Sequence, residues 1–526
     1  MAVAALAAYN HGLPLAGAIA AMHTLASYDE LPYDSLPLPE TQPDFLAAIA
    51  RLHGFEAPDP AHARILELGC AQGGNLVPLA WRWPESDCVG VELSRVQAAA
   101  GAAFIKRLGL TNVRIVHGDL AALPDDLGAF DYIIAHGVFS WVPPAVQQAL
   151  LEVCRRHLSP HGVAYISFNV TAGWSALQPL RDALLARTAS ESHAPQRYAA
   201  ARTVLDELAM EWTDPALLKE IAYLKTAAPS YLFHEYLAEY NAPLPFGEFA
   251  AQLDQHGLRY VGEAGPRRAV VELEDAWGLI PESMAERWLD AESALDDALG
   301  TRFRRAIIAR ADAPCAQPPR EDALSELAFY ADLSCDEELD LEHDSEQSFI
   351  NPTGNTFAVT DALAKAALIA LSSSYPRALS YPDLIPAIHA VRHEFGVAGE
   401  VDAARFNHAW FSLVSTHSVM LTLPEQTALE AADEPGSHPH AHALARLQAA
   451  TPGWVVSGIR HVAIDLDAAA RAMLQWMDGS RDQAALGEAM RAYLAEAGIE
   501  LSPEQLAQRI DHQLWQLVRQ GACINS

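Results

Sequence analysis

Lysine is scarce in this sequence, and acidic residues far outnumber basic ones. The 526 residues include 35 Lys and Arg against 67 Asp and Glu, which gives a formal net charge of −32 at pH 7. Proteins bind nucleic-acid phosphates and anionic lipids through clustered Lys and Arg side chains. The composition therefore argues against a nucleic-acid partner and disfavours docking on an anionic membrane.

Long hydrophobic runs and paired cysteines are also missing. The apolar runs at residues 2–8 and 13–22 are too short to span a bilayer, and no basic segment precedes them as in a signal peptide. None of the six cysteines belongs to a C-x-x-C pair, so we expect neither a disulfide framework nor a cysteine zinc site. We therefore expect a cytoplasmic protein without stable membrane insertion and without a metal.

The sequence does contain ample material for packed domains. Hydrophobic residues make up 51% of the chain, and its length corresponds to about three to four domains. Short apolar runs predict strands over residues 64–68, 87–93, 113–117, 130–135 and 162–169. Helices are predicted between them, over residues 76–83, 94–108 and 145–158. Strands that alternate with helices form parallel βαβ units, so we predict a doubly wound α/β sheet.

Composition also suggests the boundaries of the domains. We expect an N-terminal segment with a lid, the α/β domain, a helix-rich middle domain and two helix-rich modules, at residues 1–42, 43–212, 213–312, 323–430 and 443–526. Within the middle domain, residues 302–309 are predicted to be a strand that returns to a sheet. An acidic run at residues 334–346 is predicted to be solvated.

The strongest chemical signal is a glycine-rich turn after the first predicted strand. In the segment ELGCAQGGN, Gly69 permits a tight turn and Gly73 lets a ligand approach the start of the helix. Glu92 ends the second strand 19 residues after Gly73, where a carboxylate can bind the hydroxyls of a ribose. Asp119 follows the third strand and can accept a hydrogen bond from an adenine amino group. The candidate cofactor-binding set is completed by adjoining residues: Cys70, Asn75, Leu93 and Leu120.

Such a turn could bind a dinucleotide or an adenosyl compound, or it could be a generic βαβ turn with incidental acids. The G-x-G-x-x-G fingerprint is not met because Ala71 occupies its second glycine position, and the absence of G-K-[ST] excludes a P-loop. The carboxylate of Glu67 would repel a pyrophosphate but attract an ammonium or sulfonium. The pattern therefore favours S-adenosylmethionine.

Aromatic residues follow the fourth and fifth predicted strands, at the edge where a methyl acceptor would enter. Trp141 and Trp174 could line a channel for an amine, since aromatic faces attract cations, or they could pack a core. His136 could act as a general base or as a hydrogen-bonded loop residue.

Several segments together resemble the bacterial protein lysine methyltransferases known from rickettsiae, which modify outer-membrane proteins. They are YDELPY at 28–33, ILELGCAQGGNLVPLA at 65–80, FDYIIAHGVFSWVP at 130–143, YISFNVTAGW at 165–174, YLFHEYLAEYNAPLPFGEFAAQLDQHGLRYVGEA at 231–264, RFRRAIIAR at 302–310, WVVSGIRHVAIDLD at 454–467 and WMDGSRDQAAL at 476–486. The resemblance implies a Rossmann-like class I methyltransferase domain, a methyltransferase regulatory domain and winged-helix-like C-terminal modules.

The resemblance also implies roles for individual residues. Those implied to surround S-adenosylmethionine are Glu67, Gly69, Gly73, Glu92, Asp119 and His136. Those implied to lie toward the acceptor are Trp141, Asn169 and Trp174. Tyr28 and Tyr33 are implied to help close the pocket.

Three functions are compatible with these features. The first is methyl transfer to lysine side chains of a protein acceptor, such as a surface or outer-membrane protein. The second is methyl transfer to a small molecule or natural product with His136 as the base, and the third is a non-enzymatic regulator that senses S-adenosylmethionine. The resemblance favours the first, and the net negative charge would attract lysine-rich segments.

Overall fold

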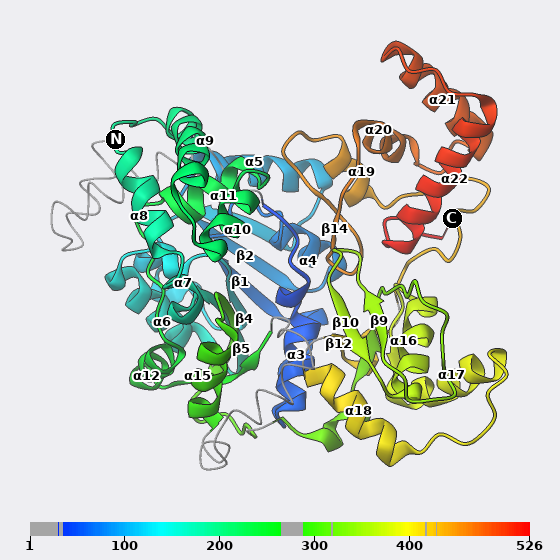
Figure 1. Ribbon diagram of the computed structural model, residues 1–526, viewed down its shortest axis with the longest axis horizontal. Coiled ribbons are helices and arrows are strands. Elements are labelled where there is room, and N and C mark those ends of the chain that lie inside the picture. The colour runs from blue at the N-terminus through cyan, green and yellow to red at the C-terminus, as the bar shows by residue number, and fades with distance from the viewer. Residues whose placement is uncertain are drawn as a thin grey trace.

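The computed structural model describes residue 30 and residues 35–264, 288–316, 319–415, 418–427 and 429–525. Tyr28 and Tyr33, expected in a lid, lie outside the described residues. A central sheet carries helices on both faces, a group of helices extends from one end of it, and two C-terminal units lie to one side (Figure 1).

The central sheet has seven strands in the order β3-β2-β1-β4-β5-β7-β6. Their bounds are β1 (Arg64–Leu68), β2 (Asp87–Glu92), β3 (Val113–His117), β4 (Phe130–Ala135), β5 (Leu158–Asn169), β6 (Leu258–Glu263) and β7 (Phe303–Arg310). The first five are parallel, which confirms the predicted α/β sheet. Strand order reverses between β1 and β4, and ligands of such sheets bind at the carboxyl ends of the strands beside this reversal.

Helices cover both faces of the sheet because its strands are apolar on both sides. On one face lie α3 (Pro43–Leu52), α4 (Leu76–Arg82) and α5 (Arg95–Leu108). On the other lie α6 (Pro144–His157) and α12 (Phe246–Gln255). Apolar side chains of β1 alternate between the two cores, with Ile65 in one and Leu66 and Leu68 in the other.

Strands β6 and β7 come from the region predicted as the middle domain, yet they extend the sheet. The predicted returning strand is confirmed as β7, which pairs antiparallel with both β5 and β6. Strand β6 has no counterpart among the predicted strands. Together they convert a parallel sheet into a mixed one, and Asn169 at the end of β5 pairs with Phe303 at the start of β7.

A helical group with its own core follows β5 and stands at the upper left of Figure 1. Its elements are α7 (Thr171–Trp174), α8 (Gln178–Arg187), α9 (Ala194–Glu211), α10 (Pro215–Leu224), α11 (Pro229–Leu232) and the π-helix η6 (Phe233–Leu237). Backbone bonds return the chain from this group to the sheet. The amide of Ala242 donates to the carbonyl of Ser140, and that of Leu244 donates to the carbonyl of Asn169.

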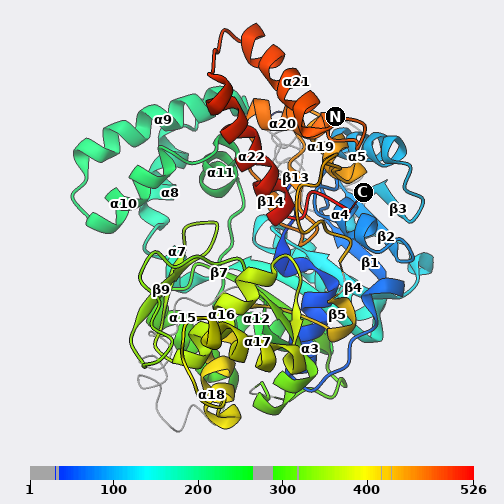
Figure 2. The same cartoon turned by 90° about the vertical axis from the view of Figure 1, so that its right-hand side faces the viewer.

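Two C-terminal units follow and lie side by side in both ribbon views (Figures 1 and 2). The first contains β8 (Ala328–Tyr330), β9 (Gln347–Ile350), β10 (Thr356–Val359), α16 (Ala362–Ser374), β11 (Leu379–Ser380), α17 (Tyr381–Glu394), α18 (Ala403–Ser415) and β12 (Met420–Thr422). The second contains α19 (Ala443–Ala449), β13 (Val456–Ser457), β14 (Ala463–Ile464), α20 (Ala468–Trp476), α21 (Gln483–Glu496) and α22 (Pro503–Arg519).

Both units pack against helices of the central sheet. The first shares one continuous core with α3, in which Phe45 and Trp410 are both buried. The second contacts α5, where the rings of Phe104 and Trp454 stack with centroids 3.6 Å apart. The two C-terminal units are therefore packed directly onto helices of the central sheet.

A buried ion cluster attaches the antiparallel strands to α15 (Trp288–Leu299). The guanidinium of Arg304, on β7, is 4% exposed. Its Nε lies 2.9 Å from Asp296, and its Nη1 lies 2.9 Å from Glu292 and 3.3 Å from Glu263. One cation is thus shared by three carboxylates in a site with little access to water.

We predict that Arg304→Met lowers the free energy of unfolding by about 3–5 kcal/mol, because three buried carboxylates lose their cation. Urea denaturation followed by circular dichroism measures this loss. The control is Arg114→Met. Arg114 forms an exposed ion pair with Asp87, with the charged atoms 2.8 Å apart, and the loss of this pair should cost less than about 1 kcal/mol of unfolding free energy. Equal losses in the two variants would contradict the prediction.

Candidate cofactor site

The glycine turn lies at the carboxyl end of β1, beside the reversal of strand order. Gly69 has φ +69° and its amide donates to the carbonyl of Val91 at 2.8 Å, which ties the turn to the end of β2. A Cβ on Gly69 would lie 2.8 Å from a methyl group of Val138, and one on Gly73 (φ +86°) would lie 2.9 Å from Ile115. The positive φ and the close contacts favour glycine at both positions, which agrees with the tight turn predicted at Gly69; ligand approach at Gly73 stays a prediction.

Ala71 gives the turn a feature that the sequence did not predict. It replaces a common glycine, yet it adopts a left-handed backbone with φ +50°. Such a conformation is uncommon for a residue with a Cβ and is retained where surrounding contacts enforce it. The amide of Ala71 donates to the Glu92 carboxylate at 2.9 Å, and this bond holds the turn in place.

Glu92 stands at the end of β2 with its carboxylate fixed by the backbone. Its Oε2 accepts from Ala71, and its Oε1 accepts from the amide of Ser94 at 2.7 Å. The side chain is 9% exposed, whereas the following Leu93 is 48% exposed. A carboxylate has about four lone-pair positions, so two fixed bonds leave it able to accept further ones. Leu93 offers an apolar surface beside it.

Glu67 is the buried acid of the site. Its Oε1 accepts from the Asn75 side-chain amide at 2.9 Å, and its Oε2 is buried with no hydrogen-bond partner among the described residues. Burial raises the pKa of Glu67 to about 8, an effect that the Asn75 hydrogen bond opposes and the nearby Glu92 reinforces. A buried acceptor without a partner is costly, so this oxygen suits a cationic ligand.

Asp119 and Leu120 lie beside Glu92, after β3. The amide of Gly118 donates to the carbonyl of Glu92 at 3.0 Å, which joins the ends of β2 and β3. The Asp119 carboxylate is exposed and accepts from the amide of Ala121 at 2.9 Å, so it caps the short helix η3 (Leu120–Ala122). Its second oxygen accepts no hydrogen bond from the residues that the structure describes, so it can accept one from a ligand. Cys70 is buried next to the turn and lies 2.5 Å from the position of a Cβ on Gly90.

His136 follows β4 and is held by a tyrosine. Its Nδ1 lies 2.9 Å from the hydroxyl of Tyr165, and its ring stacks on the same tyrosine and meets Phe303 edge-on. Burial lowers the pKa of His136 to about 4. The ring is therefore neutral near pH 7, and it is a weak base with one nitrogen already engaged.

The residues predicted to face the acceptor divide into two groups. Asn169 lies at the sheet edge, where its side-chain amide donates to Asn241 at 2.9 Å and its backbone amide donates to the Ser140 hydroxyl at 2.7 Å. Trp141 is buried in η5 (Phe139–Trp141) nearby. Trp174 instead lies in the core of the helical group, with its ring 5.6 Å from that of Tyr236.

Further residues at the site carry no local sequence signal. The hydroxyl of Ser35 accepts from the amide of Gly74 at 2.7 Å, and a Cβ on Gly74 would lie 2.2 Å from the Ser35 carbonyl oxygen. Residues 35–42 therefore lie directly on the glycine turn. The Asn75 Oδ1 accepts from the Leu38 amide at 2.9 Å and lies 2.6 Å from Nε2 of His461. Only the fold brings these residues to the turn.

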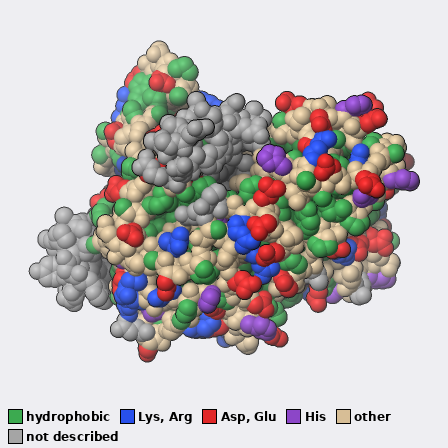
Figure 3. Space-filling view, turned by 90° about the horizontal axis from the view of Figure 1, so that it is seen from below, with side chains coloured by type: hydrophobic (Ala, Val, Ile, Leu, Met, Phe, Trp, Pro, Cys, Tyr) green, Lys and Arg blue, Asp and Glu red, His purple; other side chains and the backbone are tan. Residues whose placement is uncertain are grey.

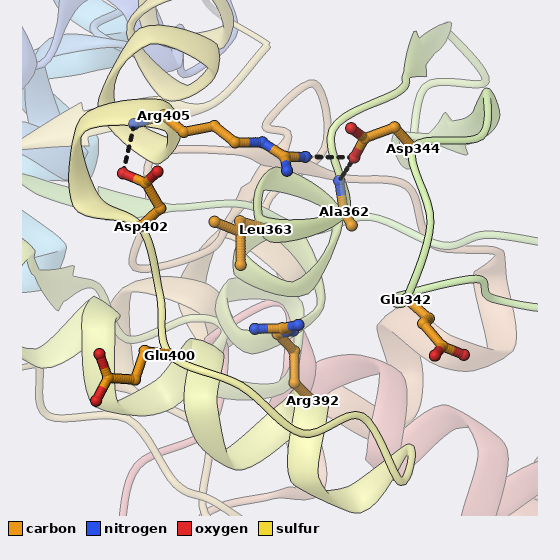
Figure 4. Close-up of a pocket in the computed structure, with 8 residues that line it drawn as sticks. All are labelled: Glu342, Asp344, Ala362, Leu363, Arg392, Glu400, Asp402 and Arg405. Carbon is orange, nitrogen blue, oxygen red and sulfur yellow. Dashed lines mark hydrogen bonds and ion pairs between the residues drawn. The ribbon is translucent and has the colours of Figure 1, made fainter.

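A separate cavity of about 160 Å³ lies in the first C-terminal unit (Figure 4). Its lining residues are Glu342, Asp344, Ala362, Leu363, Arg392, Glu400, Asp402 and Arg405. Arg405 spans one side and pairs with Asp344 and, at 2.8 Å, with Asp361. Glu342 and Asp344 belong to the acidic run and are exposed, as predicted. No lining residue comes from the central sheet, so this cavity is not part of the cofactor site.

The described residues show neither a metal-ligand cluster nor a membrane span. No group of three or more His, Cys, Asp or Glu side chains among them could hold a metal ion. None of their helices is both long enough and apolar enough to cross a bilayer. On the face seen in Figure 3, Lys and Arg side chains lie among Asp and Glu rather than in one continuous basic patch.

Three protein-family models match the chain in succession. A methyltransferase domain matches residues 65–162, a predicted methyltransferase regulatory domain matches residues 228–310, and a PKMT C-terminal winged helix domain matches residues 437–520. The last match confirms the winged-helix prediction for the final module.

Two curated proteins of Rickettsia prowazekii (strain Madrid E) are similar in sequence. The uncharacterized protein RP789 is 30% identical over 495 residues, which cover 91% of this chain and 88% of that protein. The uncharacterized protein RP028 is 35% identical over 229 residues, which cover 42% of this chain and 92% of that protein.

The fold matches two solved structures of PKMT2 from Rickettsia typhi, one of them in complex with AdoHcy. The TM-score is 0.78 for both, the sequence identity is 21% and 22%, and the alignments cover 94% of this chain and 100% of each PKMT2 chain. The succession of domains, the sequence relative and the fold agree. The chain therefore belongs to the rickettsial type of bacterial protein lysine methyltransferases, and it is an S-adenosylmethionine-dependent methyltransferase.

Proposed function

We propose that the edge formed by the ends of β1, β2, β3 and β4 binds S-adenosylmethionine and that the methyl group passes to lysine side chains of a protein acceptor. The observation that carries the cofactor assignment is the buried Oε2 of Glu67, which has no partner among the described residues and adjoins the glycine turn. S-adenosylmethionine supplies a methyl group on a sulfonium, together with a cationic ammonium. An anionic oxygen in a poorly solvated site attracts such a ligand strongly.

The other residues of the site have matching roles. Gly69 makes the tight turn with its left-handed backbone, and Gly73, which carries no side chain, lets the ligand approach the start of the helix. Glu92 accepts from the ribose hydroxyls, and its own bonds to the Ala71 and Ser94 amides keep it oriented. Asp119, at the end of β3, accepts from the adenine amino group. In these roles the residues bind one adenosyl ligand that lies across the ends of three adjacent strands, β1, β2 and β3.

The acceptor lysine must lose its proton before it can attack a methyl carbon. A free lysine has a pKa of about 10.4, and removal from water lowers it. Asn169 and Trp141 stand at the acceptor side of the edge, where Asn241 of the middle region also reaches. His136, with a lowered pKa of about 4, contributes a neutral hydrogen-bonding ring rather than a strong base. This favours the lysine acceptor over a small molecule that needs His136 as its base.

The proposal places the enzyme in the cytoplasm and gives it a lysine-rich protein partner. All six cysteines are free, as expected in a reducing compartment. The net charge of −32 attracts positively charged segments and steers them toward the enzyme. A surface or outer-membrane protein with accessible lysines is a partner of this kind.

The proposed reaction predicts acid-stable methyl label on lysine. We expect transfer from methyl-labelled S-adenosylmethionine to lysine-rich surface proteins, read by amino-acid analysis of the labelled acceptor. The Glu92→Ala variant serves as the inactive control. Label on a small metabolite with none on protein lysine would overturn the acceptor assignment while leaving the cofactor site intact.

Replacing Glu92 should weaken the binding of the cofactor. We expect Glu92→Ala to raise the Kd for S-adenosylmethionine by about 10- to 100-fold, since hydrogen bonds to a charged group contribute about 1.5–3 kcal/mol. Calorimetry measures the change. Glu85→Ala, which removes an exposed acid paired only with His62 among the described residues, should leave the Kd unchanged. A normal Kd in Glu92→Ala would contradict the proposed ribose contact.

Cofactor binding should release a proton through Glu67. With a pKa of about 8, this carboxyl is mostly protonated at pH 7, and a cationic ligand favours its ionised form. We therefore expect release of up to one proton at pH 7, and affinity that rises with pH and levels off above about pH 8. Calorimetry in buffers of different ionisation enthalpy measures the release, and Glu67→Gln should abolish it. Proton uptake on binding would contradict this role.

A further inference from the structure

The final C-terminal unit reaches the cofactor site at two points: the Gly453 carbonyl accepts from the Gln72 side chain at 2.7 Å, and His461 contacts Asn75. His461 lies in the tip between β13 and β14, and this hairpin lies beside α4 in both ribbon views (Figures 1 and 2). The Nε2 of His461 is 2.6 Å from Oδ1 of Asn75, the residue before α4, and the two side chains are 2% and 4% exposed. Asn75 in turn donates to Glu67 at 2.9 Å.

The chemistry of the three side chains defines the direction of both hydrogen bonds. The backbone amide of Leu38 can only donate, and it lies 2.9 Å from Oδ1 of Asn75, so Nδ2 of Asn75 faces Glu67 and Oδ1 faces His461. An amide oxygen only accepts, so His461 must donate from Nε2. Burial lowers the pKa of His461 to about 3, and the ring is therefore neutral with its single proton on Nε2. The Leu38 amide and the Thr41 hydroxyl donate to the same Oδ1, so a rotation of the Asn75 amide would break these bonds together with those to Glu67 and His461.

The backbone of the C-terminal unit is shaped to present this ring. His461 has φ +58°, a left-handed conformation that costs free energy in a residue with a side chain. Its amide donates to the carbonyl of Gly458 at 2.9 Å, and a Cβ on Gly458 would lie 2.0 Å from the Gln520 carbonyl oxygen. The neighbouring Arg460 is buried, donates from Nε to the Pro376 carbonyl and lies over the Tyr330 ring at 4.1 Å. The tip is thus anchored on several sides.

We infer that His461 is a positioning residue for the cofactor: through Asn75 it aims the Glu67 carboxyl at the cationic methionyl end of S-adenosylmethionine. The inference rests on the proposed role of Glu67. It makes the C-terminal unit a component of the cofactor site, and His461 itself touches no reacting atom.

The test compares two ligands that differ only in the methionyl end. S-adenosylhomocysteine carries the ammonium, whereas 5′-methylthioadenosine lacks the whole amino-acid group. In His461→Asn the backbone conformation is retained, because asparagine tolerates the left-handed region, but the shorter side chain cannot reach Asn75. We expect the Kd for S-adenosylhomocysteine to rise about tenfold and that for 5′-methylthioadenosine to stay unchanged.

His461→Gln restores a donor with nearly the reach of Nε2, so it should recover most of the affinity. The matched control is Thr451→Val, which removes the contact of Arg107 with the same C-terminal unit at 3.2 Å and does not touch Asn75. It should bind both ligands normally. If His461→Asn raised the Kd of both ligands equally, the role of His461 would be merely structural and the inference would be overturned. Normal binding of both ligands by His461→Asn would overturn it as well.

Glu67→Gln separates this inference from the proposed site. If Glu67→Gln selectively weakens the binding of S-adenosylhomocysteine and His461→Asn does not, the proposed cofactor site is supported and the inferred role of His461 is wrong. If Glu67→Gln leaves both ligands unchanged, the proposed role of Glu67 fails and the inference fails with it. Circular dichroism of each variant confirms that the fold is retained. If His461→Asn does not fold, His461→Gly replaces it, because glycine adopts the left-handed backbone readily and also lacks the donor.

Discussion

The side-chain amide of Asn75 is the contact on which the arrangement of the site depends. It donates to Glu67, accepts from the Leu38 amide and lies against His461, so that the sheet, the N-terminal segment and the final C-terminal unit meet at one group. A buried amide must satisfy both its donor and its acceptor, because unmade hydrogen bonds in a site without water are costly. One residue thereby couples the position of three distant segments to the geometry of the glycine turn.

The buried charges of the protein differ in whether the fold neutralises them. Arg304 is surrounded by three carboxylates and serves to join β7 to α15. Glu67 has one amide partner, no cation among the described residues and a raised pKa of about 8. A structural charge is paired within the chain, whereas under the proposed function Glu67 receives its counter-charge from the cofactor. Both acidic sites are buried, so burial does not distinguish them; the presence of a cation from the chain at one and not among the described residues at the other does.

The parts of the fold that follow from local pattern were predictable. Each of the five parallel strands is a short apolar run bounded by turn residues, and helices such as α5 begin at a serine cap and end at a glycine. The returning strand β7 was apolar enough to be recognised, but β6 was not, because its six residues follow a helix-rich stretch and their strand conformation depends on pairing with β7. The place of Trp174 could not be predicted for the same reason. Its ring packs in the core of the helical group, and the position of those helices depends on tertiary contacts rather than on the local sequence.

The sequence by itself determined the α/β order, the glycine turn and the acids Glu67, Glu92 and Asp119, which we propose bind the adenosyl cofactor. These features are local, because each depends on the residues within one strand and the turn that follows it. The tertiary structure alone decided that Ser35 lies on the turn, that β6 and β7 complete the sheet and that His461 reaches Asn75. Those contacts join residues tens to hundreds of positions apart, and they form only when the intervening chain has folded and packed.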